Sequence, residues 1–212
     1  MKRAVICLSL LWGFWGSGPA SVFSETVLET QSPDYIHDTQ VYRYQGSQNF
    51  KDDHLSISAN WNENYASRVY FTFDIRKFLV DQGYTPSRVI LTGIQIQLTH
   101  RKDAPGWFAP VEVHFPDTAW NEDIISWILQ PSFSNTRFTY IPNKKQGEAD
   151  ILASPLLVDR FQSFITDTTD LWKRGILLTA PNAPNEGKEE YEISYAASEN
   201  ANPVLRPRVT IT

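Results

Sequence analysis

Apolar and polar residues alternate strictly in the middle of this chain. The alternation is clearest in residues 94–99, where three aliphatic residues are interleaved with three polar ones: Ile94, Ile96 and Leu98 against Gln95, Gln97 and Thr99. Successive side chains of a strand point to opposite faces of its sheet, so this segment is predicted to be a strand with one buried and one wet face.

Similar strand-like runs recur along the chain. Clusters of turn-forming residues, such as 102–106 and 181–187, separate them. Short strands at this spacing predict an all-β fold, an antiparallel β-sandwich. Besides 94–99, strands are expected at residues 55–58, 68–75, 89–92, 111–115, 175–180, 191–196 and 204–212.

One segment has a helical period instead. Large apolar residues recur there at helical spacing: Leu157, Val158, Phe161, Phe164 and Ile165. Ser154 and Pro155 stand where an N-cap and a first-turn proline belong. We therefore expect one short helix, whose apolar face closes one end or edge of the sandwich.

The first 24 residues resemble a secretory signal peptide. Lys2 and Arg3 precede an apolar run at 4–15, and small residues follow it, which fits cleavage after Ala20 or Ser24. An uncleaved membrane anchor is the alternative, but this run is about a dozen residues long whereas a membrane span needs roughly 20. We expect residues 25–212 to form a single domain that is secreted to the extracellular space or cell surface.

Cysteine content and charge exclude several classes of protein. The only cysteine, Cys7, lies within the predicted leader, so the mature chain is expected to hold no disulfide and no thiolate metal site. The chain has 19 Lys and Arg residues, two of them in the leader, against 24 Asp and Glu residues, none in the leader. This acidic balance argues against nucleic acid and anionic membranes as partners.

Three stretches, in this order, resemble the DNRLRE domain, a carbohydrate-binding module family associated with alginate-degrading enzymes. Residues 68–75 are similar to a family strand that reads roughly Arg-Ala-Leu-Leu-Arg-Phe-Asp-Leu. Residues 118–131 are similar to Trp-Ser-Glu followed by Thr-Trp-Asn-Asn-Gln-Pro, and residues 195–208 to a closing Ser-Arg-Glu and final strand. The resemblance spans residues 34–212. Two family arginines are replaced here, by Thr72 and Ser198.

The resemblance implies a jelly-roll-like antiparallel β-sandwich in a secreted or cell-surface protein. Such domains are often attached to polysaccharide-degrading enzymes, so the expected partners are a polysaccharide and either a separate degrading enzyme or a cell-surface protein. We expect an extracellular, non-catalytic carbohydrate-binding module. A structural or adhesive protein acting through protein–protein contacts is the main alternative, and a polysaccharide-cleaving enzyme is the third.

Several residues of the family motifs are expected to be structural. Trp120 and Trp127 flank an apolar pair and are predicted to pack across the sandwich, and Trp172 is also expected in the core. Arg68 and Glu199 are predicted to form a partly buried ion pair that joins two strands.

Sugar recognition generally uses flat aromatic faces together with groups that hydrogen-bond hydroxyls. Two polar segments combine these features, 60–65 and 101–108. The alternative is that their aromatic residues fold down to cover a sheet edge. The predicted carbohydrate-binding residues are Trp61, Tyr65, Arg101, Lys102 and Trp107.

Catalytic and metal-binding motifs have little support in the sequence. The histidines lack metal-ligand spacing, and no catalytic residues, metal site or cofactor are predicted. Asp117 with Glu122 or Asp123 is the nearest approach to a carboxylate pair, but turn capping and strand-end solvation explain these residues better. A structural calcium ion stays an open alternative, because jelly-roll modules often carry one.

Overall fold

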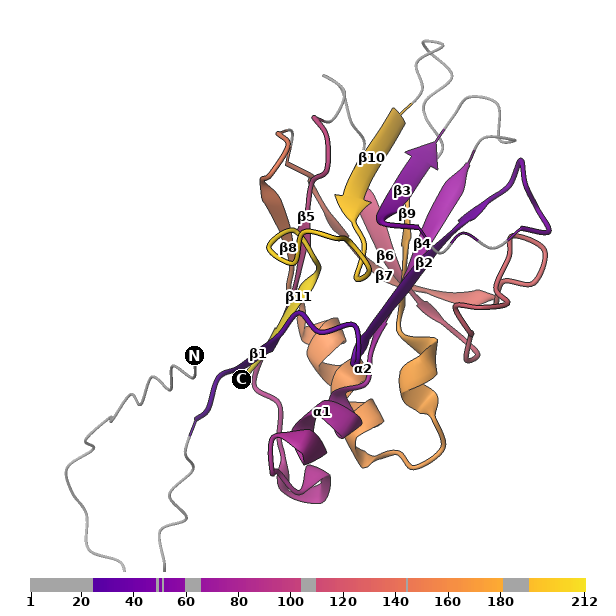
Figure 1. Cartoon of the computed structure of the whole chain (residues 1–212). Coiled ribbons are helices and arrows are strands. Elements are labelled where there is room, and N and C mark those ends of the chain that lie inside the picture. The colour runs from indigo at the N-terminus through magenta and orange to yellow at the C-terminus, as the bar shows by residue number, and fades with distance from the viewer. Residues whose placement is uncertain are drawn as a thin grey trace, which may run out of the picture.

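The computed structural model describes residues 25–48, 50, 52–59, 66–103, 110–143, 145–180 and 191–212. They form two antiparallel sheets that pack face to face (Figure 1). The smaller sheet has the order β1 (Leu28–Thr30), β11 (Arg208–Ile211), β5 (Ile94–Thr99) and β8 (Ala149–Leu152). The predicted all-β sandwich is therefore confirmed.

The larger sheet has seven strands. Six of them follow one another in the order β10 (Tyr191–Ala196), β3 (His54–Ala59), β4 (Ser67–Phe73), β9 (Ile176–Thr179), β6 (Val111–Pro116) and β7 (Phe133–Tyr140). The seventh, β2 (Ile36–Tyr42), pairs with β4 along its whole length.

Strand β4 shows how the sequence divides the larger sheet into two apolar faces. Val69, Phe71 and Phe73 are fully buried in the main core between the sheets. Tyr70, which points the opposite way, is equally buried, but in a second cluster on the outer face of the same sheet. A strand that is buried on both faces reads as a nearly continuous apolar run, as 69–73 does.

The helix predicted around residues 157–165 is present as α2 (Pro155–Thr166). The Ser154 side chain caps it by accepting a hydrogen bond from the backbone N–H of Leu156. Leu157, Phe161, Phe164 and Ile165 are buried in the main core, as the periodicity predicted.

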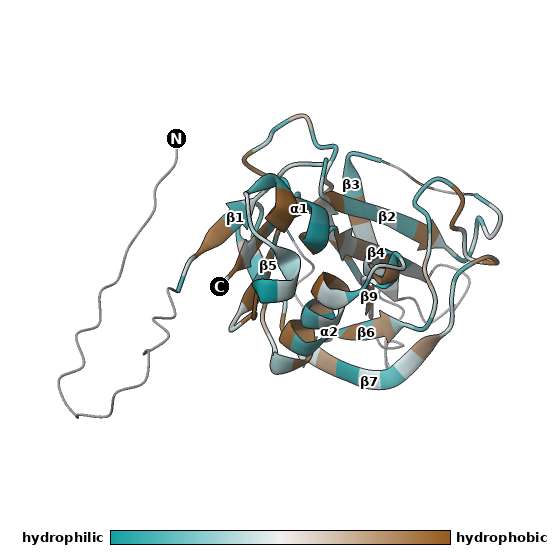
Figure 2. Cartoon of the chain, turned by 90° about the horizontal axis from the view of Figure 1, so that it is seen from below, coloured by the Kyte–Doolittle hydropathy of each residue, from teal (hydrophilic) through white to brown (hydrophobic). Residues whose placement is uncertain are grey.

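The prediction of a single helix was wrong, because a second one, α1 (Ile75–Asp81), follows β4 directly. The Asp74 carboxylate accepts a hydrogen bond from the Lys77 N–H at 2.9 Å and so caps the helix. Its buried face consists of Ile75, Phe78 and Leu79. The two helices contact each other at one end of the sandwich, the helical end (Figure 2).

Other boundaries also differ from the predictions. Residues 89–92 form no strand, because the 3-10 turn η2 (Pro86–Arg88) precedes them and the Leu91 N–H is hydrogen-bonded to the Gln162 side chain at 2.7 Å. The last strand begins at Arg208 rather than at 204, because side chains of Asn200 and Asn202 accept local backbone hydrogen bonds that hold turns. Thr99, expected on the wet face, is only 5% exposed.

No helix within the described ranges has the length and apolar character required to cross a membrane.

Candidate functional site

Arg101 and Lys102 lie just beyond the C-terminal end of β5. Strand β10 positions them, because the Arg101 N–H donates to the Ser194 carbonyl at 2.8 Å. The Arg101 guanidinium lies 3.0 Å from the Asp53 carboxylate, and Lys102 Nζ lies 2.9 Å from Glu192. All four side chains are about half exposed. We call Asp53, Arg101, Lys102 and Glu192 the charged rim.

Lys102 and Glu192 of the charged rim lie near two segments that connect strands. Glu192 pairs in register with Ser58 near the end of β3, just before residues 60–65, and Lys102 precedes residues 104–109. The flanks of these two segments are therefore neighbours. The predicted binding residues Trp61, Tyr65 and Trp107 belong to these segments and lie outside the described residues.

Glu192 is a charged acceptor at this rim. Burial acts to raise the pKa of Glu192, but hydrogen bonds from Lys102 at 2.9 Å and Ser56 at 2.9 Å outweigh it and hold the pKa below its usual value. The rim thus presents two cations, each already paired with a carboxylate.

A buried polar network lies directly beneath the rim. His100 Nε2 lies 3.0 Å from the Asp150 carboxylate, which also accepts from the Tyr195 hydroxyl and from the Asn143 N–H. Tyr195 in turn lies 2.9 Å from the hydroxyl of Tyr140. Burial, and then the neighbouring Tyr140 and Asp150, raises the pKa of Tyr195 well above its usual value. This network fixes His100, and with it the start of the rim segment.

The segment after β10 supports the rim from the other side. The Ser198 N–H donates to the buried Asp38 carboxylate at 2.9 Å, and the Ala197 N–H donates to the Asp53 carbonyl at 3.1 Å. Burial, and then the nearby charge of Glu199, raises the pKa of Asp38 well above its usual value. The rim is therefore built over two buried carboxylates, Asp38 and Asp150.

The predicted ion pair between Arg68 and Glu199 is wrong. Arg68 donates to the Gln130 side chain at 2.9 Å and stacks on the ring of Trp127, 4.5 Å from its centroid. Glu199 instead accepts a hydrogen bond from the neighbouring Ser198 hydroxyl. Partial burial favours such stacking for Arg68, because a planar guanidinium is weakly hydrated and fits an aromatic face.

Trp120 and Trp127 have structural positions, but they do not pack across the sandwich as expected. Trp120 is 7% exposed and packs edge-on against Tyr70 on the outer face of the larger sheet. Its indole N–H donates to the Arg174 carbonyl at 3.1 Å. Trp127 packs against the same outer cluster and is partly buried. Trp172, also partly buried, packs against the main core.

The carboxylates considered for catalysis lie in the loop after β6. Asp117 accepts a hydrogen bond from the Ser132 hydroxyl at 2.8 Å, and the Asp123 N–H is capped by Asn121. Glu122 lies 3.4 Å from His37. Contacts of this kind stabilise the conformation of a loop. The absence of catalysis stays a prediction.

Within the described part of the chain, no group of three or more His, Cys, Asp or Glu residues is arranged to hold a metal ion. The structural calcium ion considered from the sequence stays untested by this observation.

No family model matches the chain, and no curated protein matches it. Among solved structures, the chain is similar to one titled "Structure of infectious bursal disease virus Gx strain", with 10% sequence identity and a TM-score of 0.19. The match covers 93% of this chain and 40% of that chain. A likeness this weak carries no argument about fold or function. The resemblance to the DNRLRE family therefore stays a prediction.

Proposed function

We propose that this chain is an extracellular, non-catalytic module that binds a polysaccharide at the charged rim. Two positions carry the proposal. Lys102 is half exposed beside Glu192, which is the cross-strand partner of Ser58 near the segment containing Trp61, and Arg101 lies shortly before the segment containing Trp107. The two segments contain aromatic residues, so together with Arg101 and Lys102 they supply both kinds of group that sugar recognition uses. The resemblance to the DNRLRE family supports the same ligand class.

The ion pairs of the rim favour a ligand that carries some negative charge. Exposed ion pairs contribute only about 0–1 kcal/mol, so a uronate or sulfate group can replace Asp53 or Glu192 at small cost. The net negative charge of the whole chain opposes a highly charged polymer. A polysaccharide with sparse acidic groups fits both features best.

Calorimetry of the purified chain against alginate, pectin, chitin, xylan and sulfated glycans tests the proposal. Arg101→Ala/Lys102→Ala is expected to weaken binding of an acidic glycan by about threefold or more, through the loss of two charge contacts. Trp61→Ala and Trp107→Ala are expected to weaken binding of any glycan by about tenfold.

The matched control is Lys77→Ala/Arg88→Ala, which removes two cations at the helical end. Lys77, like Lys102, is held by an exposed carboxylate, Asp81, at 2.6 Å. This control is expected to bind glycans as the unmodified chain does. Failure of the unmodified chain to bind any of these polymers would refute the proposal, and release of reducing ends during incubation would refute its non-catalytic part.

Secretion is part of the proposal. We expect the protein in the culture medium, with a mature N-terminus after Ala20 or Ser24, which N-terminal sequencing would reveal. Retention of residues 1–24 in a membrane fraction would contradict it.

A second candidate function is adhesion through association with another copy of the chain. The observation that favours it is an apolar patch on the loop after β6, where Ile124, Ile128 and Leu129 are 67%, 72% and 69% exposed. The turn at Gly46 adjoins it, because the Ile128 N–H donates to the Gly46 carbonyl. Light scattering over a concentration series tests this function: Ile128→Ser/Leu129→Ser should abolish any association, and a monomer at every concentration excludes it.

A further inference from the structure

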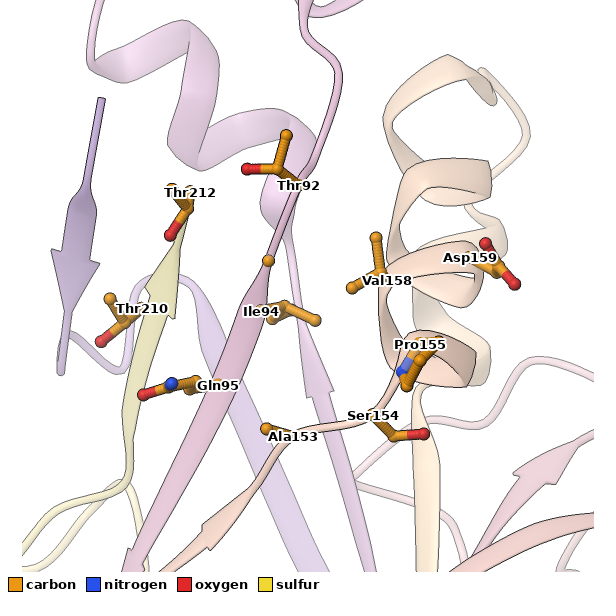
Figure 3. Close-up of a pocket in the computed structure, with 11 residues that line it drawn as sticks. Thr92, Ile94, Gln95, Ala153, Ser154, Pro155, Val158, Asp159, Thr210 and Thr212 are labelled. Atoms are coloured by element: carbon orange, nitrogen blue, oxygen red, sulfur yellow. The ribbon is translucent and has the colours of Figure 1, made fainter. Parts of the chain in front are cut away.

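A groove of about 540 Å³ opens between α2 and the strands β5 and β11, toward the helical end of the molecule (Figure 3). Its volume lies within the range of about 300–1,000 Å³ that is typical of small-molecule sites. Of the predicted carbohydrate-binding residues, the structure describes Arg101 and Lys102, and neither of these two lines the groove.

The groove exists because the smaller sheet loses a strand before α2 begins. Strand β8 ends at Leu152, opposite Ile96, whereas β5 extends on to Ile94 with β11 as its neighbour on the other side. The chain then turns away through Ala153 into α2. Gly93 also lines the groove, beside the Thr212 side chain.

One wall of the groove is a row of neutral polar side chains. Gln95 and Thr210 are cross-strand partners, and Thr92 and Thr212 continue the row past the strand ends. We call these four residues the hydroxyl–amide row. Within the described ranges, none of the four side chains makes a hydrogen bond to the protein. Each can both donate and accept, as sugar hydroxyls do.

The other wall is apolar. Val158 points from α2 toward Ile94 of β5, and Pro155 lies in the first turn of the helix (Figure 3). Asp159, which is the one charged residue in the described part of the lining, extends away from β5 in the same view. The Ser154 hydroxyl is already engaged as the helix cap.

We propose that this groove is a second binding site, specific for an uncharged segment of a polysaccharide. Hydroxyl groups of the sugar would meet the hydroxyl–amide row, and its C–H face would pack against Val158 and Pro155. Among the described residues, the lining offers no cation to an anionic ligand, and the Asp159 carboxylate points away from β5. The site differs in place and chemistry from the charged rim, and rests on the proposed function only for its ligand class.

The test is calorimetry with the neutral hexasaccharides of xylan, cellulose and laminarin. Thr210→Val/Thr212→Val removes two hydroxyls while keeping the side-chain shape, and is expected to weaken binding by about tenfold. The matched control, Thr136→Val/Thr139→Val, makes the same change at exposed positions of β7 and should leave affinity within about twofold. Thermal unfolding of both variants checks that each is folded.

Gln95→Leu provides a second variant and is expected to weaken binding by about threefold. Neutral hexasaccharides that bind the unmodified chain and both groove variants equally would overturn this site and leave the rim proposal intact. Binding of acidic glycans without binding of any neutral hexasaccharide would also overturn the groove site. Loss of all glycan binding by the unmodified chain would refute both proposals.

Discussion

The charged rim and the groove lie near opposite ends of the same strand, β5, and differ in how their polar groups are used. From Gln95 to Arg101 is roughly 20 Å along an extended chain. At the rim, both cations are held in ion pairs with carboxylates. In the groove, the hydroxyl–amide row has no hydrogen-bond partner among the described residues.

This difference has consequences for binding. A ligand at the rim must displace an existing partner, so its affinity should depend on charge and fall with salt. A ligand in the groove displaces only water, so its affinity should be nearly independent of salt. The supports of the two regions differ too, because the rim stands on the buried carboxylates Asp38 and Asp150.

The largest effect is expected from Asp150→Ala. The substitution leaves His100, Tyr195 and the Asn143 N–H without their shared acceptor, which should reduce the free energy of unfolding by about 3–5 kcal/mol. Urea unfolding measures it. Asp159→Ala, an exposed carboxylate beside the groove, is the control and should change stability by no more than about 0.5 kcal/mol. If the two substitutions changed the free energy of unfolding equally, the buried network around Asp150 would not stabilise the structure beneath the rim.

Asp38→Asn should raise the free energy of unfolding by about 1–3 kcal/mol at neutral pH. The amide needs neither to take up a proton nor to bury a charge on folding, and its oxygen can still accept from the Ser198 N–H. The folded-state pKa of Asp38 lies above its unfolded value. Its protonation therefore stabilises the fold fully below about pH 4, and this stabilisation is lost as pH rises through the folded pKa.

Thermal unfolding between pH 4 and pH 8 checks this sign. The unmodified chain should lose more stability than the Asp38→Asn variant over that interval. A variant that is less stable than the unmodified chain at pH 7 would mean that the ionised Asp38 carboxylate has a partner that stabilises it.

The smallest effect is expected from Asp53→Asn/Glu192→Gln. This variant removes the ion-pair partners of Arg101 and Lys102, so the polar groups of the rim, like those of the groove, are left without a charged partner. Affinity for an acidic oligosaccharide should rise about threefold, since each exposed ion pair contributes about 0.2–1 kcal/mol. Affinity for a neutral hexasaccharide should not change. Calorimetry at low salt measures both, and a decrease for the acidic ligand would show that the carboxylates position the cations rather than compete for them.

The sequence predicted those elements whose apolar residues follow one period. The strand at 191–196 and the helix α2 have the expected positions because their large apolar side chains enter the main core. Strand β2 was missed because Asp38, Thr39 and Gln40 are buried polar residues that interrupt any alternation. Helix α1 was missed because seven residues are too few to show a period after a strand-like run.

The two sites were predictable to different degrees. Arg101 and Lys102 stand out in the sequence beside Trp107, but their partners Asp53 and Glu192 are distant in the chain. Only the pairing of β3 with β10, and the bridge between His100 and Tyr195 just beyond β5, brings them near. The groove had no sequence signal at all. Its walls come from separate segments around Gly93, Ser154 and Thr210, and no motif links them.

The most direct test of carbohydrate binding is to map amide chemical shifts of the ¹⁵N-labelled chain during titration with an acidic and a neutral oligosaccharide. We expect the acidic ligand to shift Arg101, Lys102 and their neighbours, and the neutral ligand to shift the hydroxyl–amide row. Shifts confined to the apolar patch around Ile128, or no shifts with either ligand, would contradict the proposed function.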